Sequence, residues 1–96
     1  MFIISLTYVR PLDEIDAHLA AHRDFLREQY GRGVLLMSGR KVPRDGGILI
    51  ANAETRAEVE ALVEQDPFRR AGLAEYVITE FVPTMTADAL AGFRED

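Results

Sequence analysis

Residues 34–52 read VLLMSGRKVPRDGGILIAN and contain two short apolar runs separated by a polar loop. The runs 34–39 and 47–52 have the length and the aliphatic content of β-strands. The loop between them contains Pro43 and an Asp-Gly pair, which are typical of a turn between two paired strands. We therefore predict a β-hairpin in the middle of the chain.

One helix is predicted on each side of this hairpin. Before it, apolar residues recur at helical spacing between Asp13 and Tyr30, and the acidic residues that follow Pro11 favour a helix start. After it, the Thr-x-x-Glu pattern that begins at Thr55 has the form of a capping box, and Pro67 ends the helix that this box opens. The hairpin is therefore expected to lie between two helices, each with one apolar face.

A strand is predicted near each end of this arrangement, over 2–9 and 76–82. The element order is then β-α-β-β-α-β, which is typical of a ferredoxin-like α+β domain with a four-stranded antiparallel sheet and two helices on one face. Ile3, Ile48 and Ile50 lie on the strand faces opposite to the main apolar positions, so both faces of the sheet carry apolar side chains. We expect the face without helices to be buried in a homodimer.

The composition narrows the class of protein. A chain of 96 residues suffices for one domain, 1–96, and we expect a core over about 1–83 followed by a C-terminal tail. Eleven basic and sixteen acidic residues give a net charge of −5, which disfavours binding to nucleic acid. No apolar run is long enough to span a membrane and the first residues do not resemble a secretory signal, so a cytoplasmic protein is expected. Without cysteine, disulfides, thiolate zinc sites and a cysteine nucleophile are excluded.

His22 is the first candidate for chemistry, because histidine is the residue type that changes charge near neutral pH. On a helix it falls among Ile15, Leu19 and Leu26, so it is expected to face the sheet. The alternative is a core histidine whose hydrogen bonds are satisfied. His18 lies at the edge of the same apolar stripe and is expected to be a boundary residue.

Asp66 is the second candidate, since a carboxylate can hydrogen-bond and orient a general-base imidazole. An aspartate before Pro67 is also a common helix N-cap, and capping alone would explain the residue. The two roles are compatible, because one carboxylate oxygen can cap the turn while the other accepts a hydrogen bond from His22.

Three further side chains are candidate substrate contacts: Tyr8, Ser38 and Arg40. Arg40 belongs with Lys41 and Arg44 to a basic loop in an acidic chain, and such a loop could attract a small anionic substrate. Each also has a plain structural interpretation, since Ser38 could simply end a strand and the loop could simply be solvated.

No metal site and no cofactor are expected. His18 and His22 are four residues apart and could share one metal ion, but a third ligand and a His-Glu-x-x-His pattern are missing. The chain has no glycine loop for a phosphate or a dinucleotide and no nucleophile elbow, and neither histidine has the surroundings of a haem ligand.

Three segments of the chain resemble the YciI-like, or YCII-related, family. Their order and spacing in a chain of this size carry the resemblance: AHRDFL at 21–26, GVLLMSG at 33–39, and DPF at 66–68 leading to AGL at 71–73. The resemblance extends from the first strand to Phe81 and implies a ferredoxin-like domain of the dimeric α+β barrel kind.

The resemblance also implies a site in which the histidine and the aspartate of the family match His22 and Asp66. It implies kinship with small enzymes that isomerise lactones or eliminate halide from oxidised aromatic compounds. Some relatives have an arginine where this chain has Leu19, so a substrate contact made by that arginine cannot be transferred.

Two hypotheses about function follow. The first is a small cofactor-free enzyme of lyase or isomerase type, in which His22, oriented by Asp66, moves a proton on a small metabolite. The second is a non-catalytic module that binds a small ligand or serves as an accessory protein, in which the same pair stabilises the fold.

Overall fold

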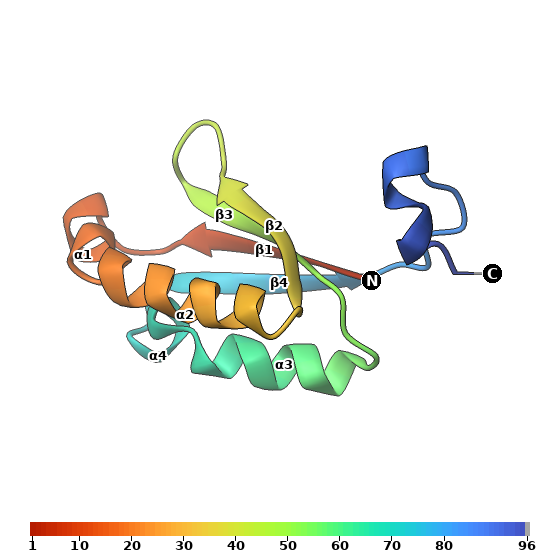
Figure 1. The fold of residues 1–96 in the computed structure, drawn as a ribbon. Coiled ribbons are helices and arrows are strands. Elements are labelled where there is room, and N and C mark those ends of the chain that lie inside the picture. Colours follow the sequence, from red (N-terminus) through yellow and green to blue (C-terminus); the bar gives the residue numbers. More distant parts are fainter. Residues whose placement is uncertain (96) are drawn as a thin grey trace.

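The computed structural model describes residues 1–95 and contains one four-stranded sheet with helices on one of its faces (Figure 1). The strand order is β2-β3-β1-β4, and every neighbouring pair is antiparallel. The elements are β1 (Phe2–Tyr8), α1 (Leu12–Ala17), α2 (Leu19–Gly31), β2 (Leu35–Arg40), β3 (Gly46–Ala51), α3 (Arg56–Gln65), α4 (Pro67–Arg70), β4 (Ala74–Glu80) and the 3-10 helix η1 (Asp88–Phe93). The predicted ferredoxin-like α+β fold is confirmed.

The first helical segment differs from the single helix predicted over Asp13–Tyr30, because the chain leaves helical geometry at His18. The backbone of this residue has φ −108° and ψ 3°, and the residue ends α1 and precedes α2. Beyond the break, α2 buries His22, Phe25 and Gln29, whereas Tyr30 is 39% exposed. Leu19 and Leu26 of the predicted stripe are half-buried against the core, so the buried face of α2 keeps most of that stripe, extends toward Phe25 and leaves Tyr30 out.

The second helical segment begins as the capping box predicts. The Oγ1 atom of Thr55 accepts a hydrogen bond from the backbone N–H of Glu58 at 3.2 Å. The Glu58 carboxylate accepts from the backbone N–H of Glu54, one residue earlier than the standard box, at 3.2 Å. Helix α3 ends at Gln65, and the one-turn helix α4 follows directly, because Pro67 can begin a helix but cannot continue one.

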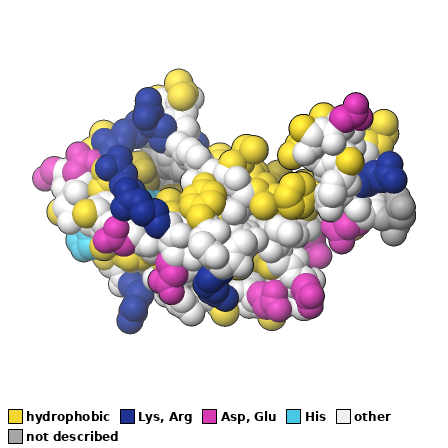
Figure 2. Space-filling model, in the orientation of Figure 1, with side chains coloured by type: hydrophobic (Ala, Val, Ile, Leu, Met, Phe, Trp, Pro, Cys, Tyr) yellow, Lys and Arg dark blue, Asp and Glu magenta, His cyan; other side chains and the backbone are white. Residues whose placement is uncertain are grey.

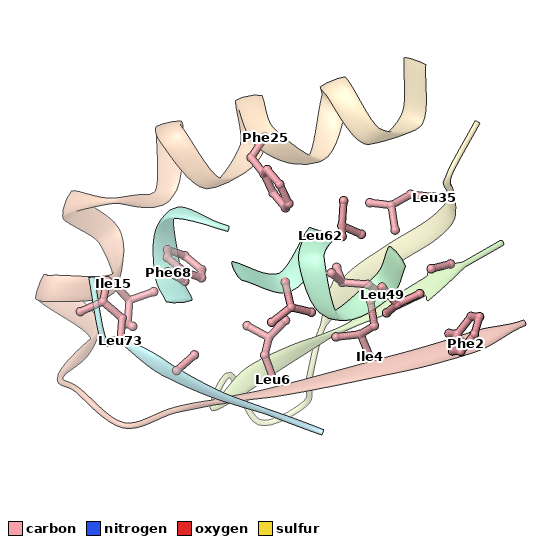
Figure 3. Packing of buried hydrophobic residues seen from close by; sticks show 14 residues of the cluster. Phe2, Ile4, Leu6, Ile15, Phe25, Leu35, Leu49, Leu62, Phe68 and Leu73 are labelled. Carbon is pink, nitrogen blue, oxygen red and sulfur yellow. The ribbon is translucent and has the colours of Figure 1, made fainter. Parts of the chain in front are cut away.

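The core lies between the sheet and the helices (Figure 3). Phe2, Ile4 and Leu6 of β1 alternate toward the helices and are at most 1% exposed. They meet Phe68 of α4 and Val59 of α3, which are both fully buried. Each such side chain contributes about 1.5–3 kcal/mol through burial, so this layer is the main source of stability.

The other face of the sheet carries no helix and remains partly apolar. Ile3, Ile48 and Ile50 are half-buried there, while Met37 and Val77 are 59% and 63% exposed. The tail that carries η1 stands away from the helices beyond the end of β4 (Figure 1). An apolar hollow of about 440 Å³ lies between the tail and this face; residues that line it include Leu36, Met37, Ile50, Phe81, Met85 and Leu90.

Within residues 1–95, no helix is long and apolar enough to cross a membrane. The expected C-terminal tail contains η1, and Asp96 lies outside the described residues.

Candidate functional site

His22 and Asp66 meet in the interior, although 44 positions separate them in the chain. The Nδ1 atom of His22 lies 2.8 Å from Oδ1 of Asp66, and the two residues are 7% and 1% exposed. Because a carboxylate oxygen accepts, Nδ1 carries the hydrogen and the neutral ring has its lone pair on Nε2. That nitrogen has no hydrogen-bond partner among residues 1–95, and no buried polar side-chain atom among them is unpaired, so solvent reaches Nε2.

Asp66 is held by three donors. It is the N-cap of α4, and its Oδ1 accepts from the backbone N–H of Phe68 at 3.0 Å as well as from His22. Its Oδ2 accepts from the hydroxyl of Tyr76 at 2.5 Å. We expected the cap and the imidazole to use different oxygens; instead Oδ1 accepts from both, and Oδ2 accepts from Tyr76. The carboxylate therefore has a fixed orientation.

Tyr76 is part of this arrangement and was not predicted from the sequence. It lies on β4, directly across from Leu6, on the face of the sheet that the helices cover. Burial is the main cause that raises the pKa of the Tyr76 phenol above its usual value, and the adjacent Asp66 charge adds to the effect. Tyr76 therefore stays a neutral donor to Asp66. The only signal for it in the sequence is its inward register on β4.

Phe68 sets the position of the His22 ring from the other side. The two rings are stacked, with centroids 4.0 Å apart and planes 7° from parallel. Tyr8 of β1 contacts the same phenylalanine edge-on, with centroids 5.9 Å apart. The imidazole is therefore fixed by a stacked ring and by a carboxylate, and its remaining freedom is small.

A hollow of about 230 Å³ opens beside His22, between α2 and the strands β1, β2 and β3. Its polar lining includes all three predicted substrate contacts, and the five polar residues are Tyr8, His22, Arg23, Ser38 and Arg40. Its apolar lining consists of leucines from the same elements: Leu6, Leu19, Leu26 and Leu49. Asp66 does not line the hollow; it lies behind the imidazole and acts on it from the interior.

Ser38 and Arg40 reach this hollow by their register on β2. Ser38 lies opposite Leu49 and Arg40 opposite Gly47, so both are on the sheet face that the helices cover. The hydroxyls of Ser38 and Tyr30 are 2.6 Å apart, which connects the strand to the end of α2. Arg23 also lines the hollow and was missed, because a charged residue beside a buried helix face resembles any solvated residue.

The basic loop between β2 and β3 is attached to the rest of the domain. Arg44 donates to Asp16 of α1, and Lys41 donates to Thr7 of β1 at 3.1 Å. The hydrogen bond with Asp16 is the largest cause that raises the pKa of the Arg44 guanidinium. These two cations are therefore paired within the domain, unlike Arg40.

Metal-ligating side chains do not cluster within residues 1–95. In the described part of the chain, no group of three or more histidine, aspartate or glutamate side chains could hold a metal ion. His18 is exposed at the helix break, where its Nδ1 lies 3.2 Å from the carbonyl oxygen of Glu14. A larger hollow of about 680 Å³ lies near Arg32 and Glu58 and contains neither His22 nor Asp66.

Comparison with known proteins places the chain in a family. No curated protein matches the chain. Among solved structures, the chain is similar to 5-chloro-2-hydroxyhydroquinone dehydrochlorinase (TftG) from Burkholderia phenoliruptrix AC1100, determined in complex with 2,5-dihydroxybenzoquinone. The identity is 26% and the TM-score 0.71, over 84% of this chain and 93% of that one. The family model described as YCII-related domain matches residues 1–82, and the chain therefore belongs to the YCII-related family.

Proposed function

We propose that this protein is a small enzyme that needs no cofactor and uses His22 to move a proton on a small metabolite, in a lyase or isomerase reaction. One observation carries the proposal: the imidazole is fixed by Asp66 at 2.8 Å through Nδ1, while Nε2 is free and belongs to a ring that lines a hollow. An imidazole held in this way is a general base in its neutral form and a general acid after it accepts the proton.

The proposed chemistry balances without an external reagent. Nε2 of His22 removes a proton from a carbon or hydroxyl of the substrate, and the released electron pair forms a new double bond. In an elimination, a leaving group departs with its electron pair from the neighbouring atom. In an isomerisation, an existing double bond of the substrate breaks as the new one forms, and its electron pair takes the proton back from the imidazolium at a different carbon. Asp66 stabilises the imidazolium while it exists, as a buried carboxylate does for other general-base histidines.

The similar structure supports the reaction class. TftG is a dehydrochlorinase, which removes the elements of hydrogen chloride, and its structure holds a quinone of single-ring size. A hollow of about 150 Å³ suffices for benzene, so about 230 Å³ beside His22 suffices for one substituted ring. We infer that Tyr8, Ser38 and Arg40 contact the substrate from the walls of the hollow, with Arg40 favouring an anionic one.

The test is turnover by matched histidine variants. The first substrates are 5-chloro-2-hydroxyhydroquinone and a panel of small lactones and hydroxyquinones. Turnover of the chlorinated compound is measured as chloride release. His22→Gln should lower kcat by about 10²- to 10⁴-fold. His18→Gln is the control, because His18 is exposed and bonds only to a backbone carbonyl. A His22→Gln protein with wild-type kcat would exclude His22 from the mechanism.

The second hypothesis, a non-catalytic ligand-binding or accessory module, is favoured by the low exposure of His22 and by the three donors that Asp66 satisfies. The two hypotheses differ in one measurable respect. A binding module should bind small ring compounds beside His22 with no turnover of any of them, and its His22→Gln variant should lose stability instead of activity.

We propose that the protein forms a homodimer through the sheet face without helices. Met37 and Val77 expose most of their apolar surface there, and the apolar hollow beside the tail continues this surface. Light scattering at micromolar concentration should give about twice the 10.8 kDa of one chain. Val77→Lys should shift the mass toward the monomer, whereas Ala61→Lys, on the exposed side of α3, should not. A wild-type protein that is monomeric at this concentration would contradict the proposal.

A further inference from the structure

Two arginines beside the site have no partner within residues 1–95. Five other arginines of the domain form ion pairs with a carboxylate: Arg10, Arg27, Arg44, Arg56 and Arg69. Arg23 and Arg40 form neither an ion pair nor a side-chain hydrogen bond with the described residues. Arg70 also forms neither, so the lack of a partner does not by itself mark a site; Arg23 and Arg40 differ from Arg70 because they line the hollow beside His22.

Both of these arginines line the hollow beside His22, and they come from opposite walls. Arg23 follows His22 on α2. Arg40 ends β2 opposite Gly47, on the sheet face that α2 covers. Gly47 lines the hollow and has no side chain that would fill it. Figure 2 shows lysine and arginine side chains in a band that runs from the β2–β3 hairpin to helix α2.

The rest of the lining restricts what such a pair can bind. No aspartate or glutamate lines the hollow, so nothing within it neutralises the two positive charges. The floor is made of Leu6, Leu19, Leu26 and Leu49 and is apolar. Guanidinium groups bind carboxylates strongly because their N–H donors match the two carboxylate oxygens. A ligand that fits both features has an apolar body of about one ring and one anionic group at the rim.

We propose that Arg23 and Arg40 together bind the carboxylate of a monocyclic substrate and so determine the charge specificity of the site. This inference rests on the proposed function in that it identifies the substrate class of the same site, a carboxylate attached to a single ring. The ring lies on the leucine floor, and the carboxylate accepts hydrogen bonds from the helix on one side and from the strand on the other. His22 then faces the ring and not the carboxylate.

The experiment compares a charged probe with a neutral probe of the same shape. Benzoate and benzamide are titrated separately into the ¹⁵N-labelled protein, and the shifts of residues around the hollow are followed by NMR. Benzoate should bind at least about 10-fold more tightly than benzamide, and its affinity should fall as salt is raised. Arg23→Gln and Arg40→Gln should each weaken benzoate binding by about 5- to 10-fold and leave benzamide unchanged.

Arg27→Gln is the matched control, since Arg27 lies one turn beyond Arg23 on α2, pairs with Asp24 and does not line the hollow. It should bind benzoate as the wild type does. Equal affinities for benzoate and benzamide, no shifts around the hollow at tens of millimolar benzoate, or benzoate binding unchanged by both Arg23→Gln and Arg40→Gln would each overturn the proposal.

The test separates this inference from the proposed function. His22→Gln should still bind benzoate, because the probe is held by the arginines, while it loses turnover. Charge-selective binding without any turnover would leave the arginine pair in place and remove the enzymatic role. Turnover that depends on His22 but does not prefer carboxylates would support the enzymatic role and overturn the proposed role of the two arginines.

Discussion

Replacement of Asp66 by asparagine or alanine should separate the structural role of this carboxylate from its charge. The carboxylate accepts from the His22 ring, from the backbone N–H of Phe68 and from the Tyr76 hydroxyl. In Asp66→Ala the first two donors are left unsatisfied in a buried position, at about 1–3 kcal/mol each. The third donor is partly buried and can turn to solvent. The expected loss is about 3–5 kcal/mol, a large part of the stability of a small domain.

Asp66→Asn should cost much less. The Phe68 N–H cannot reverse its direction, so the amide oxygen takes the Oδ1 position and continues to accept from both Phe68 and His22. The amide NH₂ takes the Oδ2 position, and the Tyr76 hydroxyl rotates to accept from it. All three hydrogen bonds remain but lose the contribution of the charge, so the expected loss is about 1–2 kcal/mol.

Urea unfolding at neutral pH, followed by circular dichroism, measures both losses. Asp24→Asn is the control, because the Asp24 side chain is 77% exposed, and it should change stability by less than about 0.5 kcal/mol. Nitrogen NMR of the His22 ring should find the hydrogen on Nδ1 in both the wild type and Asp66→Asn. Equal losses for Asp66→Asn and Asp66→Ala, or a hydrogen on Nε2 in the neutral wild-type ring, would refute this account of the site.

Further predictions concern the residues around this pair. Because burial raises the pKa of Tyr76 above its usual value near 10, the unfolded chain loses this proton at a lower pH than the folded one. The stability that Tyr76 provides is therefore complete below about pH 10, and above it the free energy of unfolding decreases by up to about 1.4 kcal/mol per pH unit. In urea unfolding at alkaline pH, Tyr76→Phe should remove this contribution to the pH dependence. Phe68→Ala should lower the free energy of unfolding by about 3–5 kcal/mol, since the ring is fully buried and stacks on His22, and a loss below about 1 kcal/mol would contradict that packing. Tyr30→Phe removes only an exposed hydrogen bond to Ser38 and should cost less than about 1 kcal/mol by the same measurement.

Several parts of the fold could be predicted because their causes are local. The Thr55 capping box, the turn that begins at Pro67 and the alternation along β1 depend on residues within a few positions of one another. The break at His18 could not be predicted, because no proline or glycine marks it. The burial of Gln29, at 1% exposure, could not be predicted either, since periodicity indicates an apolar face and this residue is polar.

The candidate site shows the same division between local and long-range causes. His22 was identified from its place on an apolar helix face and Asp66 from its place before a proline, and their pairing was a hypothesis from chemistry. Tyr76 and Arg23 were missed, because an inward tyrosine on a strand resembles core and a charged residue on a helix resembles solvated surface. Their roles exist only with respect to side chains on other elements.

The amino-acid sequence by itself determined the order of the elements, their approximate ends and the absence of any thiol chemistry, since these depend on composition and on neighbouring residues. Only the tertiary structure decided which nitrogen of His22 is free, which oxygen of Asp66 it meets and which arginines are left without a carboxylate. Those properties depend on angles and distances of a few ångströms between segments that are far apart in the chain, and no pattern within a single segment contains them.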